Sequence, residues 1–531
     1  MLEKDRSLHS MIQLGSIRQR NRPLETLTWL TGFAGLVWFA VNWILSGDLK
    51  WQELTAVAVI AITIGLATLG NWRVGLYLIP VWLVFEDFAR KFLGNNMFVY
   101  MGKDALVGIV YVAFFYGLRH RVEKSWRPPF GLPLLLFLAW AAVEAFNPLT
   151  PSISYGLLGL KLYFYYVPLI FVGYVFIRTE LDLRRFLVFN LALGALVSLL
   201  GVIQAITGQR FLNPEVLDRD LLVLGDLHRN SPISGLVFNR PTSVFVSDGR
   251  FGAYLILMWV MSFGTVGYLM FRGGRGRKLV YLCAATVLAA ILLSGVRTSL
   301  VYSLIGTAAM AGGIVWGTRL REEQLLRTFK AIRRFVLFSA AGAICVALLY
   351  PSQLASRWAF YTETLSPSGP GSELAARGWQ YPISEFSKTF GLENWWWGRG
   401  LGTASLGTQY VVRFLNAPPP GPVVENGYGS LLLEMGVPGL ILWIFLTVAI
   451  ARACWKVVKS LRWTPMFPLA FCIFWFALIV LFPLSFVSLA TYQDFIITAY
   501  LWIFIGILFR LPAILDSPTA AQDKPLFRWP R

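Results

Sequence analysis

Three side chains in the second half of the sequence could together transfer a group from a phosphorylated donor. Arg297 interrupts the apolar run Leu-Leu-Ser-Gly-Val-Arg-Thr-Ser-Leu, where a charge is costly unless it faces a partner or a polar cavity. Arg377 lies in the run Ala-Ala-Arg-Gly-Trp-Gln-Tyr, and Glu425 directly precedes another apolar stretch. Guanidinium groups stabilise a leaving diphosphate, and a carboxylate can accept the proton of an attacking hydroxyl. Arg297 is therefore a functional candidate by default, and Arg377 and Glu425 are of types that would suit such a reaction.

Two of these residues also have a structural explanation. Arg297 could extend to lipid headgroups, because long basic side chains can keep their charge in water while their stems stay in lipid. Glu425 could simply cap the helix expected from Gly427, since carboxylates are favourable at helix starts. The sequence leaves both explanations open.

Further polar residues are candidates for binding the substrate. Arg240 and Arg250 bracket the run Arg-Pro-Thr-Ser-Val-Phe-Val-Ser-Asp-Gly-Arg directly before an apolar stretch, and a structural role for them is equally compatible with the sequence. Asn426 precedes the same expected helix as Glu425, and backbone amides at a helix start favour phosphate. Glu434, about two turns inside that helix, is expected to be structural.

Several kinds of catalytic centre have no counterpart in the sequence. There is no P-loop, no Asp-rich metal site and no serine triad, and the three histidines and four cysteines are scattered without metal-ligand spacing. We expect no cofactor and no metal. The reaction must then use a substrate that is already activated, and a lipid-linked sugar diphosphate meets that requirement.

The elements that must position these residues are membrane spans. Of the 531 residues, 56% are hydrophobic and 14% are charged, whereas a soluble domain carries about 25% charged residues. Apolar stretches of about 20 residues, each long enough to cross a bilayer, recur along the chain. We predict an all-α polytopic membrane protein of about fourteen helices, near residues 27–46, 53–70, 73–87, 103–118, 129–146, 155–177, 185–206, 250–271, 278–296, 299–317, 335–350, 427–450, 466–487 and 493–511.

The basic residues give these spans an orientation. The formal net charge is +19, and when the spans alternate, every strongly basic connection falls on one side, as is typical of cytoplasmic loops. This explains most of the charge excess without a nucleic-acid partner. We expect a bacterial inner-membrane protein with both termini in the cytoplasm, and the turn that carries Arg297 then faces the periplasm.

The same alternation divides the chain into membrane and loop segments. The longer of two periplasmic loops exceeds the length at which unstructured loops become uncommon, which indicates function. The expected segments are a cytoplasmic N-terminus (1–26), an N-terminal bundle (27–206), a periplasmic loop (207–249), membrane helices (250–350), a large periplasmic loop (351–426), C-terminal membrane helices (427–511) and a cytoplasmic tail (512–531).

Three pieces between about Leu293 and Leu440 resemble, in order, the shared region of O-antigen ligases, Wzy-type O-antigen polymerases and related exopolysaccharide polymerases. The Ser-Gly-Val-Arg-Thr run at Arg297 is similar to the family's Ser-Arg-Gly/Thr start of a span. Arg377-Gly-Trp379, followed by Gly-Arg-Gly-Leu-Gly, resembles its Arg-x-x-x-Trp and Gly-x-Gly elements, with a shorter gap. The run Glu425-Asn-Gly-Tyr-Gly-Ser-Leu-Leu-Leu-Glu-Met-Gly-Val-Pro-Gly-Leu resembles its His-Asn-x-x-Leu…Glu-x-Gly-x-x-Gly-Leu ending.

The resemblance implies a GT-C-like, metal-independent glycosyltransferase whose donor is an undecaprenyl-diphosphate-linked glycan. Arg297 and Arg377 would hold the diphosphate, and Trp379 is a further substrate-binding candidate. The histidine of the ligases is replaced here by Glu425, which can still act as a base but favours a polymerase over a ligase.

We therefore expect polymerisation of lipid-linked repeat units into O-antigen or exopolysaccharide, with the bilayer and other polysaccharide assembly proteins as partners. Two alternatives stay open. One is a ligase that transfers the finished glycan to lipid A-core or to protein. The other is a transporter or flippase, although such proteins often show paired repeats and broken helices, which we do not find in the sequence.

Overall fold

The structure is a computed structural model that describes residues 49–93, 97–119, 126–214, 228–272, 277–318, 333, 348, 350–366, 372–374, 376–488 and 491–515. The described chain is mostly helical, and eight of its helices are long and apolar enough to cross a membrane. The protein is therefore a helical membrane protein. The expected span 27–46 and nearly all of 335–350 lie outside the described residues, so the total of fourteen stays a prediction.

The chain forms two compact units, and unit 1 contains residues 1–82 and 97–124. Its described helices are α3 (Leu49–Gly70), the first part of α4 (Trp72–Phe92) and α5 (Met97–Arg119). The indole of Trp72 meets the ring of Phe114 edge-on, with 5.1 Å between ring centroids. A Cβ at Gly75 would lie only 2.5 Å from Val110, so this glycine lets α4 and α5 approach closely.

Unit 2 contains residues 83–96 and 125–531. It begins with the last turns of α4 and continues with α6 (Gly131–Glu144), α7 (Ile153–Phe164), α8 (Leu169–Phe176) and α9 (Glu180–Thr207). The expected span 155–177 is present as one membrane-crossing segment, Ile153–Phe176, in which a turn that ends at Pro168 separates α7 from α8; proline lacks the N–H that a continuous helix would use.

The remaining membrane helices of unit 2 agree closely with the expected starts. Helix α13 begins at Arg297 and α18 begins at Gly427. Helix α18 runs ten residues further than expected and contains a break at Gly436, whose φ is 64°. The set comprises α11 (Asp248–Arg272), α12 (Arg277–Leu293), α13 (Arg297–Gly317), α18 (Gly427–Ser460), α19 (Phe467–Ile479), a π-helix (Val480–Leu484), α20 (Ser485–Val487) and α21 (Phe495–Leu515).

Helices α8 and α21 pack against each other through glycines. A Cβ at Gly173 would lie 2.4 Å from the carbonyl oxygen of Ile503, and a Cβ at Gly506 would lie 2.1 Å from that of Ile170. Small residues allow such close backbone contact, which is a main source of helix association in membranes.

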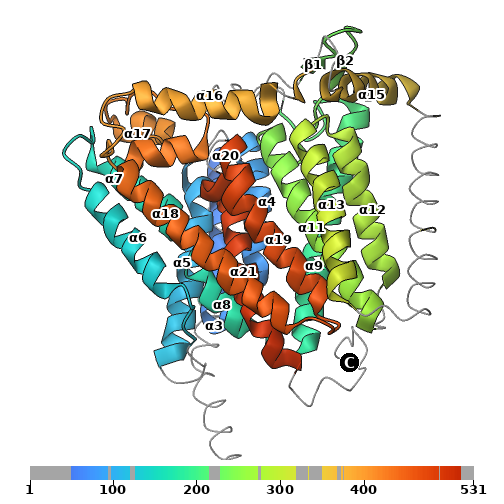
Figure 1. Cartoon of the computed structure of the whole chain (residues 1–531), viewed down its shortest axis with the longest axis horizontal. Coiled ribbons are helices and arrows are strands. Elements are labelled where there is room, and N and C mark those ends of the chain that lie inside the picture. Colours follow the sequence, from blue (N-terminus) through green and yellow to red (C-terminus); the bar gives the residue numbers. More distant parts are fainter. Residues whose placement is uncertain are drawn as a thin grey trace, which may run out of the picture. The chain divides into compact units, whose positions relative to one another are not determined.

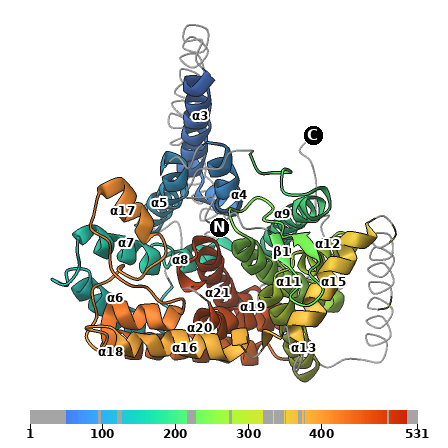
Figure 2. The same ribbon diagram turned by 90° about the horizontal axis from the view of Figure 1, so that it is seen from above.

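The two expected loops contribute short elements that lie across one end of the helices of unit 2, which we call the loop end (Figures 1 and 2). Strands β1 (His228–Asn230) and β2 (Val237–Asn239) form an antiparallel hairpin, a small departure from the expected all-α fold. The longer loop forms α15 (Pro351–Leu365), a π-helix (Ala376–Gln380), α16 (Tyr381–Lys388), a 3₁₀ turn (Thr389–Gly391) and α17 (Thr408–Leu415).

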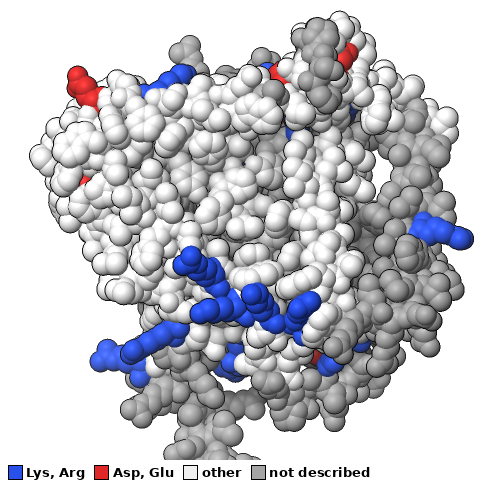
Figure 3. Space-filling view, in the orientation of Figure 1, with Lys and Arg blue, Asp and Glu red and all other residues white. Residues whose placement is uncertain are grey.

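Basic side chains gather at the opposite end. In Figure 3 Lys and Arg side chains cluster below a wide uncharged belt, on the side away from α15 and α16. Arg272 in the last turn of α11 and Lys459 in the last turn of α18 both belong to the helix ends that point away from the loop end. The expected segregation of positive charge to one end is thus present in the folded chain.

Candidate functional site

Arg297 and Arg377 line the same cavity, which has a volume of about 440 Å³. Their side chains come from different elements: Arg297 starts α13, and Arg377 belongs to the π-helix Ala376–Gln380. The lining consists of His228, Arg229, Asn230, Arg297, Phe360, Glu373 and Arg377. The cavity is therefore built where the β-hairpin, α15, the π-helix and the start of α13 meet.

Glu373 joins the two arginines. Its Oε2 lies 2.7 Å from Nη1 of Arg297 and 3.7 Å from Nε of Arg377. The hydrogen bond to Arg297 holds the pKa of Glu373 below its usual value. The Glu373 backbone is fixed as well, because its N–H donates to the Thr364 carbonyl (2.9 Å) and its own carbonyl accepts from the Arg377 N–H (2.8 Å).

A tight turn places Arg297 in this cavity. Gly295 has a φ of 67°, a conformation that glycine adopts at no steric cost, and a Cβ there would lie 2.4 Å from the ring of Phe238. The Arg297 guanidinium then lies over the ring of Phe360, 5.1 Å from its centroid. An arginine at the start of a membrane helix is thus directed to an ion pair and an aromatic face within the protein.

A chain of contacts leads from the cavity to Glu425. The guanidinium of Arg377 lies 4.8 Å from the centroid of the Tyr381 ring, and the Tyr381 hydroxyl donates a hydrogen bond to Oε2 of Glu425. This hydrogen bond raises the pKa of Tyr381 to about 12. The structure therefore connects all three predicted catalytic residues, although Glu425 does not line the cavity itself.

Asn426 fixes the position of Glu425. Its Oδ1 accepts a hydrogen bond from the Gly429 N–H (2.9 Å) and so caps α18. Its Nδ2 donates to the carbonyls of Pro382 (3.0 Å) and Phe486 (2.7 Å), and the residue is fully buried. The amide that we expected to bind substrate is occupied by the protein's own backbone.

Arg240 and Arg250 are held by carboxylates outside the cavity lining. Arg240 forms an ion pair with Asp248. Nη1 of Arg250 lies 3.0 Å from both carboxylate oxygens of Asp87, and its Nε lies 3.4 Å from Asp494. Both predicted binding residues therefore stabilise the fold around the start of α11.

The segment between these two arginines is buried as well. Lys91 donates to the Thr242 hydroxyl (3.2 Å) and to the Ser243 carbonyl (3.1 Å), and Gln204 accepts from the backbone N–H groups of Thr242 and Ser243. Backbone that is not helical is tolerated at membrane depth only when the protein satisfies its polar groups. Trp379, the remaining predicted binding residue, is 61% exposed beside Arg377.

Arg357 has a positioning role that the sequence did not reveal. It is 1% exposed, and it donates to the carbonyls of Leu293 (2.8 Å), Ala205 (3.0 Å) and Asn239 (3.0 Å). Leu293 ends α12 and Ala205 lies in the last turn of α9, where the helix dipole favours a cation. Burial lowers the pKa of Arg357 to about 10. This side chain ties α15, and with it Phe360, to three other segments.

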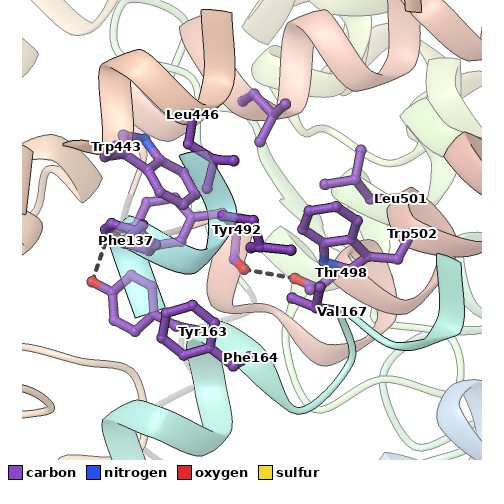
Figure 4. A pocket seen from close by; sticks show the side chains of 12 residues that line it. Phe137, Tyr163, Phe164, Val167, Trp443, Leu446, Tyr492, Thr498, Leu501 and Trp502 are labelled. Atoms are coloured by element: carbon purple, nitrogen blue, oxygen red, sulfur yellow. Dashed lines mark hydrogen bonds between the residues drawn. The ribbon is translucent and has the colours of Figure 1, made fainter. Parts of the chain in front are cut away.

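A second polar centre lies beneath the start of α18. The fully buried Glu434 accepts hydrogen bonds from the hydroxyls of Ser405 (2.6 Å) and Tyr163 (3.0 Å) and from the Ala404 N–H (3.0 Å). Tyr163 meets Tyr492 (3.3 Å between hydroxyl oxygens), whose hydroxyl donates to the Gly427 carbonyl. Figure 4 shows both tyrosines on the wall of a small cavity of about 20 Å³. The expectation that Glu434 is structural fits these contacts.

The Gly-Arg-Gly-Leu-Gly run docks into the break of α18. The Arg399 and Gly400 N–H groups donate to the carbonyls of Leu433 and Glu434, and the Val437 N–H donates to the Trp396 carbonyl. Pro438 cannot donate to the helix, and the outer-loop backbone satisfies the groups that the break leaves open. The loop and the first turns of α18 therefore form one element.

Comparison with known proteins does not assign the chain to a family: no protein-family model matches it, and no curated protein matches it.

Proposed function

We propose that this protein is a polysaccharide polymerase that acts at the periplasmic face of the bacterial inner membrane. Its donor would be a glycan linked to undecaprenyl diphosphate, and its acceptor a second lipid-linked repeat unit. The observation that carries the proposal is the shared cavity of Arg297 and Arg377, connected through Tyr381 to the carboxylate of Glu425.

The proposed reaction is a single displacement at the anomeric carbon of the donor glycan. A hydroxyl of the acceptor attacks this carbon, and the bond from the carbon to the diphosphate oxygen breaks. Glu425 takes the proton of the hydroxyl, and the electron pair leaves with undecaprenyl diphosphate. Arg297 and Arg377 stabilise the charge that develops on this leaving group.

The position of the cavity supports a lipid-linked donor. Arg297 is the first residue of a helix long enough to cross the membrane, so a diphosphate bound there would keep its prenyl chain next to lipid. The arginine-lined cavity and Glu425 lie at the loop end, opposite the basic face. With the basic face in the cytoplasm, the site faces the periplasm. We propose a cytoplasmic location for the two termini as well, which lie outside the described residues.

Reconstitution with a lipid-linked oligosaccharide tests this function. The purified chain in proteoliposomes should convert the oligosaccharide into longer lipid-linked products, and Arg413→Ala, outside the cavity, should retain this activity. Transfer to lipid A-core or protein would instead identify a ligase. Movement across the bilayer without a change in covalent bonds would identify a flippase.

A further inference from the structure

The cavity contains a third arginine that the proposed reaction does not use. Arg229 lies in β1, opposite Phe238 of β2, and its side chain lines the cavity with Arg297 and Arg377. Among the described residues, no carboxylate lies within ion-pair distance of Arg229, although its charge helps to lower the pKa of the nearby Glu373. A guanidinium that faces a polar cavity and has no close ion pair there is available to bind an anion.

The charges of the lining do not cancel. Three arginines face one carboxylate, Glu373, so the lining carries two positive charges in excess, without counting His228. In the longer loop as a whole (351–426), by contrast, acidic and basic residues are equal in number. The positive lining selects for a ligand with more than one negative charge. A diphosphate meets that requirement.

Glu373 occupies a position that suits such an anion. Its carboxylate touches both Arg297 and Arg377, so any phosphate that binds the two guanidinium groups must first displace it. Only the side chain has to move, because hydrogen bonds to Thr364 and Arg377 hold the backbone. The Glu373 side chain is 38% exposed, so it can turn into solvent at little cost.

We propose that Arg229 is a third ligand of this anion site, and that Glu373 is an internal competitor that holds Arg297 and Arg377 until a phosphate displaces it. The inference rests on the proposed function for the identity of the anion. Arg229, which forms no ion pair with a described carboxylate, makes the first contact. The displaced carboxylate then leaves three guanidinium groups around the diphosphate.

Binding of inorganic pyrophosphate to the full chain in nanodiscs tests both parts by calorimetry at low salt. Glu373→Gln keeps the size of the side chain but removes its charge, and we expect it to bind pyrophosphate about tenfold more tightly than the unchanged protein. We expect Arg229→Ala to bind about tenfold more weakly. Each tenfold change corresponds to about 1.4 kcal/mol. The matched controls are Glu393→Gln and Arg413→Ala, which remove the same charges outside the cavity.

Unchanged or weaker binding by Glu373→Gln would overturn the competitor role. If Glu373 only positioned the two arginines, removal of its charge would weaken the binding of pyrophosphate. Equal binding by Arg229→Ala and Arg413→Ala would overturn the ligand role. If neither the unchanged protein nor Glu373→Gln binds pyrophosphate, the whole inference fails. Chain lengthening is measured separately, so pyrophosphate binding without polymerisation would refute the proposed function and leave this inference standing.

Discussion

Two pairs of arginines near the loop end behave differently in this protein. Arg240 and Arg250 are neutralised by Asp248, Asp87 and Asp494, whereas Arg297 and Arg377 share the single carboxylate of Glu373 in an open cavity. The first pair holds buried segments together and the second faces a space that a ligand could fill. The two roles differ in the number of carboxylates that neutralise each pair of arginines. The position of an arginine next to an apolar stretch does not distinguish them.

The largest effect should come from breaking the neutralised pair. Arg250→Ala leaves the buried carboxylate of Asp87 without its closest cation, and such a loss typically costs about 3–5 kcal/mol. We expect a much lower melting temperature in detergent, measured by tryptophan fluorescence. The double variant Arg250→Met with Asp87→Leu should recover part of the loss. A single variant as stable as the unchanged protein would show that the two pairs do not differ.

Removal of an arginine from the cavity should instead affect activity more than stability. Arg297→Ala should reduce chain lengthening about 10²–10³-fold, in the range found when one group that stabilises transition-state charge is lost. Its melting temperature should change far less than that of Arg250→Ala. Normal product lengths from Arg297→Ala in a reconstituted assay would exclude a role for this residue in the reaction.

A smaller effect should come from the contact that leads to Glu425. Tyr381→Phe keeps the ring next to Arg377 and removes only the hydroxyl that donates to Glu425. The hydrogen bond is exposed, so we expect a loss of about 3–10-fold in rate, equivalent to about 0.7–1.4 kcal/mol. Tyr381→Ala removes the ring as well and should lose more. Equal rates for the unchanged protein, Tyr381→Phe and Tyr381→Ala would mean that Tyr381 has no role in the reaction.

The smallest effect concerns pH. Because the pKa of Glu373 is lowered in the folded protein by Arg297, its ion pair contributes stability above the unfolded pKa of about 4.3 and loses it as the pH falls through the folded value. The partly exposed pair is screened by solvent, so the contribution should stay below about 1 kcal/mol. Melting curves should show no Glu373-dependent change between pH 7 and 5. Below pH 4 the difference between the unchanged protein and Glu373→Gln should shrink.

The sequence predicted those parts of the structure that depend on neighbouring residues. The start of α18 follows from the apolar stretch that begins at Gly427, although Asn426 caps this helix and not Glu425, for which we had considered that role. The start of α13 follows from a charge at the edge of an apolar run. The shared side of Arg297 and Arg377 follows from the alternation of spans. These predictions use patterns within a few residues, or the observation that every strongly basic connection falls on the same side of the membrane.

Partners far apart in the sequence could not be predicted in the same way. Arg250 and Asp87 are 163 residues apart, and Asp87 is simply the last residue of the short expected span 73–87. Arg229 is brought to the cavity by a hairpin of two three-residue strands, which is too short for a reliable alternation pattern. The role of Arg357 could not be predicted either, because its three carbonyl partners come from segments far apart in the sequence.

The docking of Gly398–Gly402 into the break of α18 has a consequence for how this region tolerates change in length. The glycines of this run all have positive φ, and a Cβ at Gly402 would lie 1.9 Å from the Tyr155 carbonyl oxygen. One inserted or deleted residue here would move the backbone N–H groups of Arg399 and Gly400 away from the carbonyls of Leu433 and Glu434. Helix α18 is fixed in the membrane and could not shift to restore these hydrogen bonds. Sequence length should therefore be conserved between Trp396 and Gly402, even in relatives whose surrounding loop has grown or shrunk.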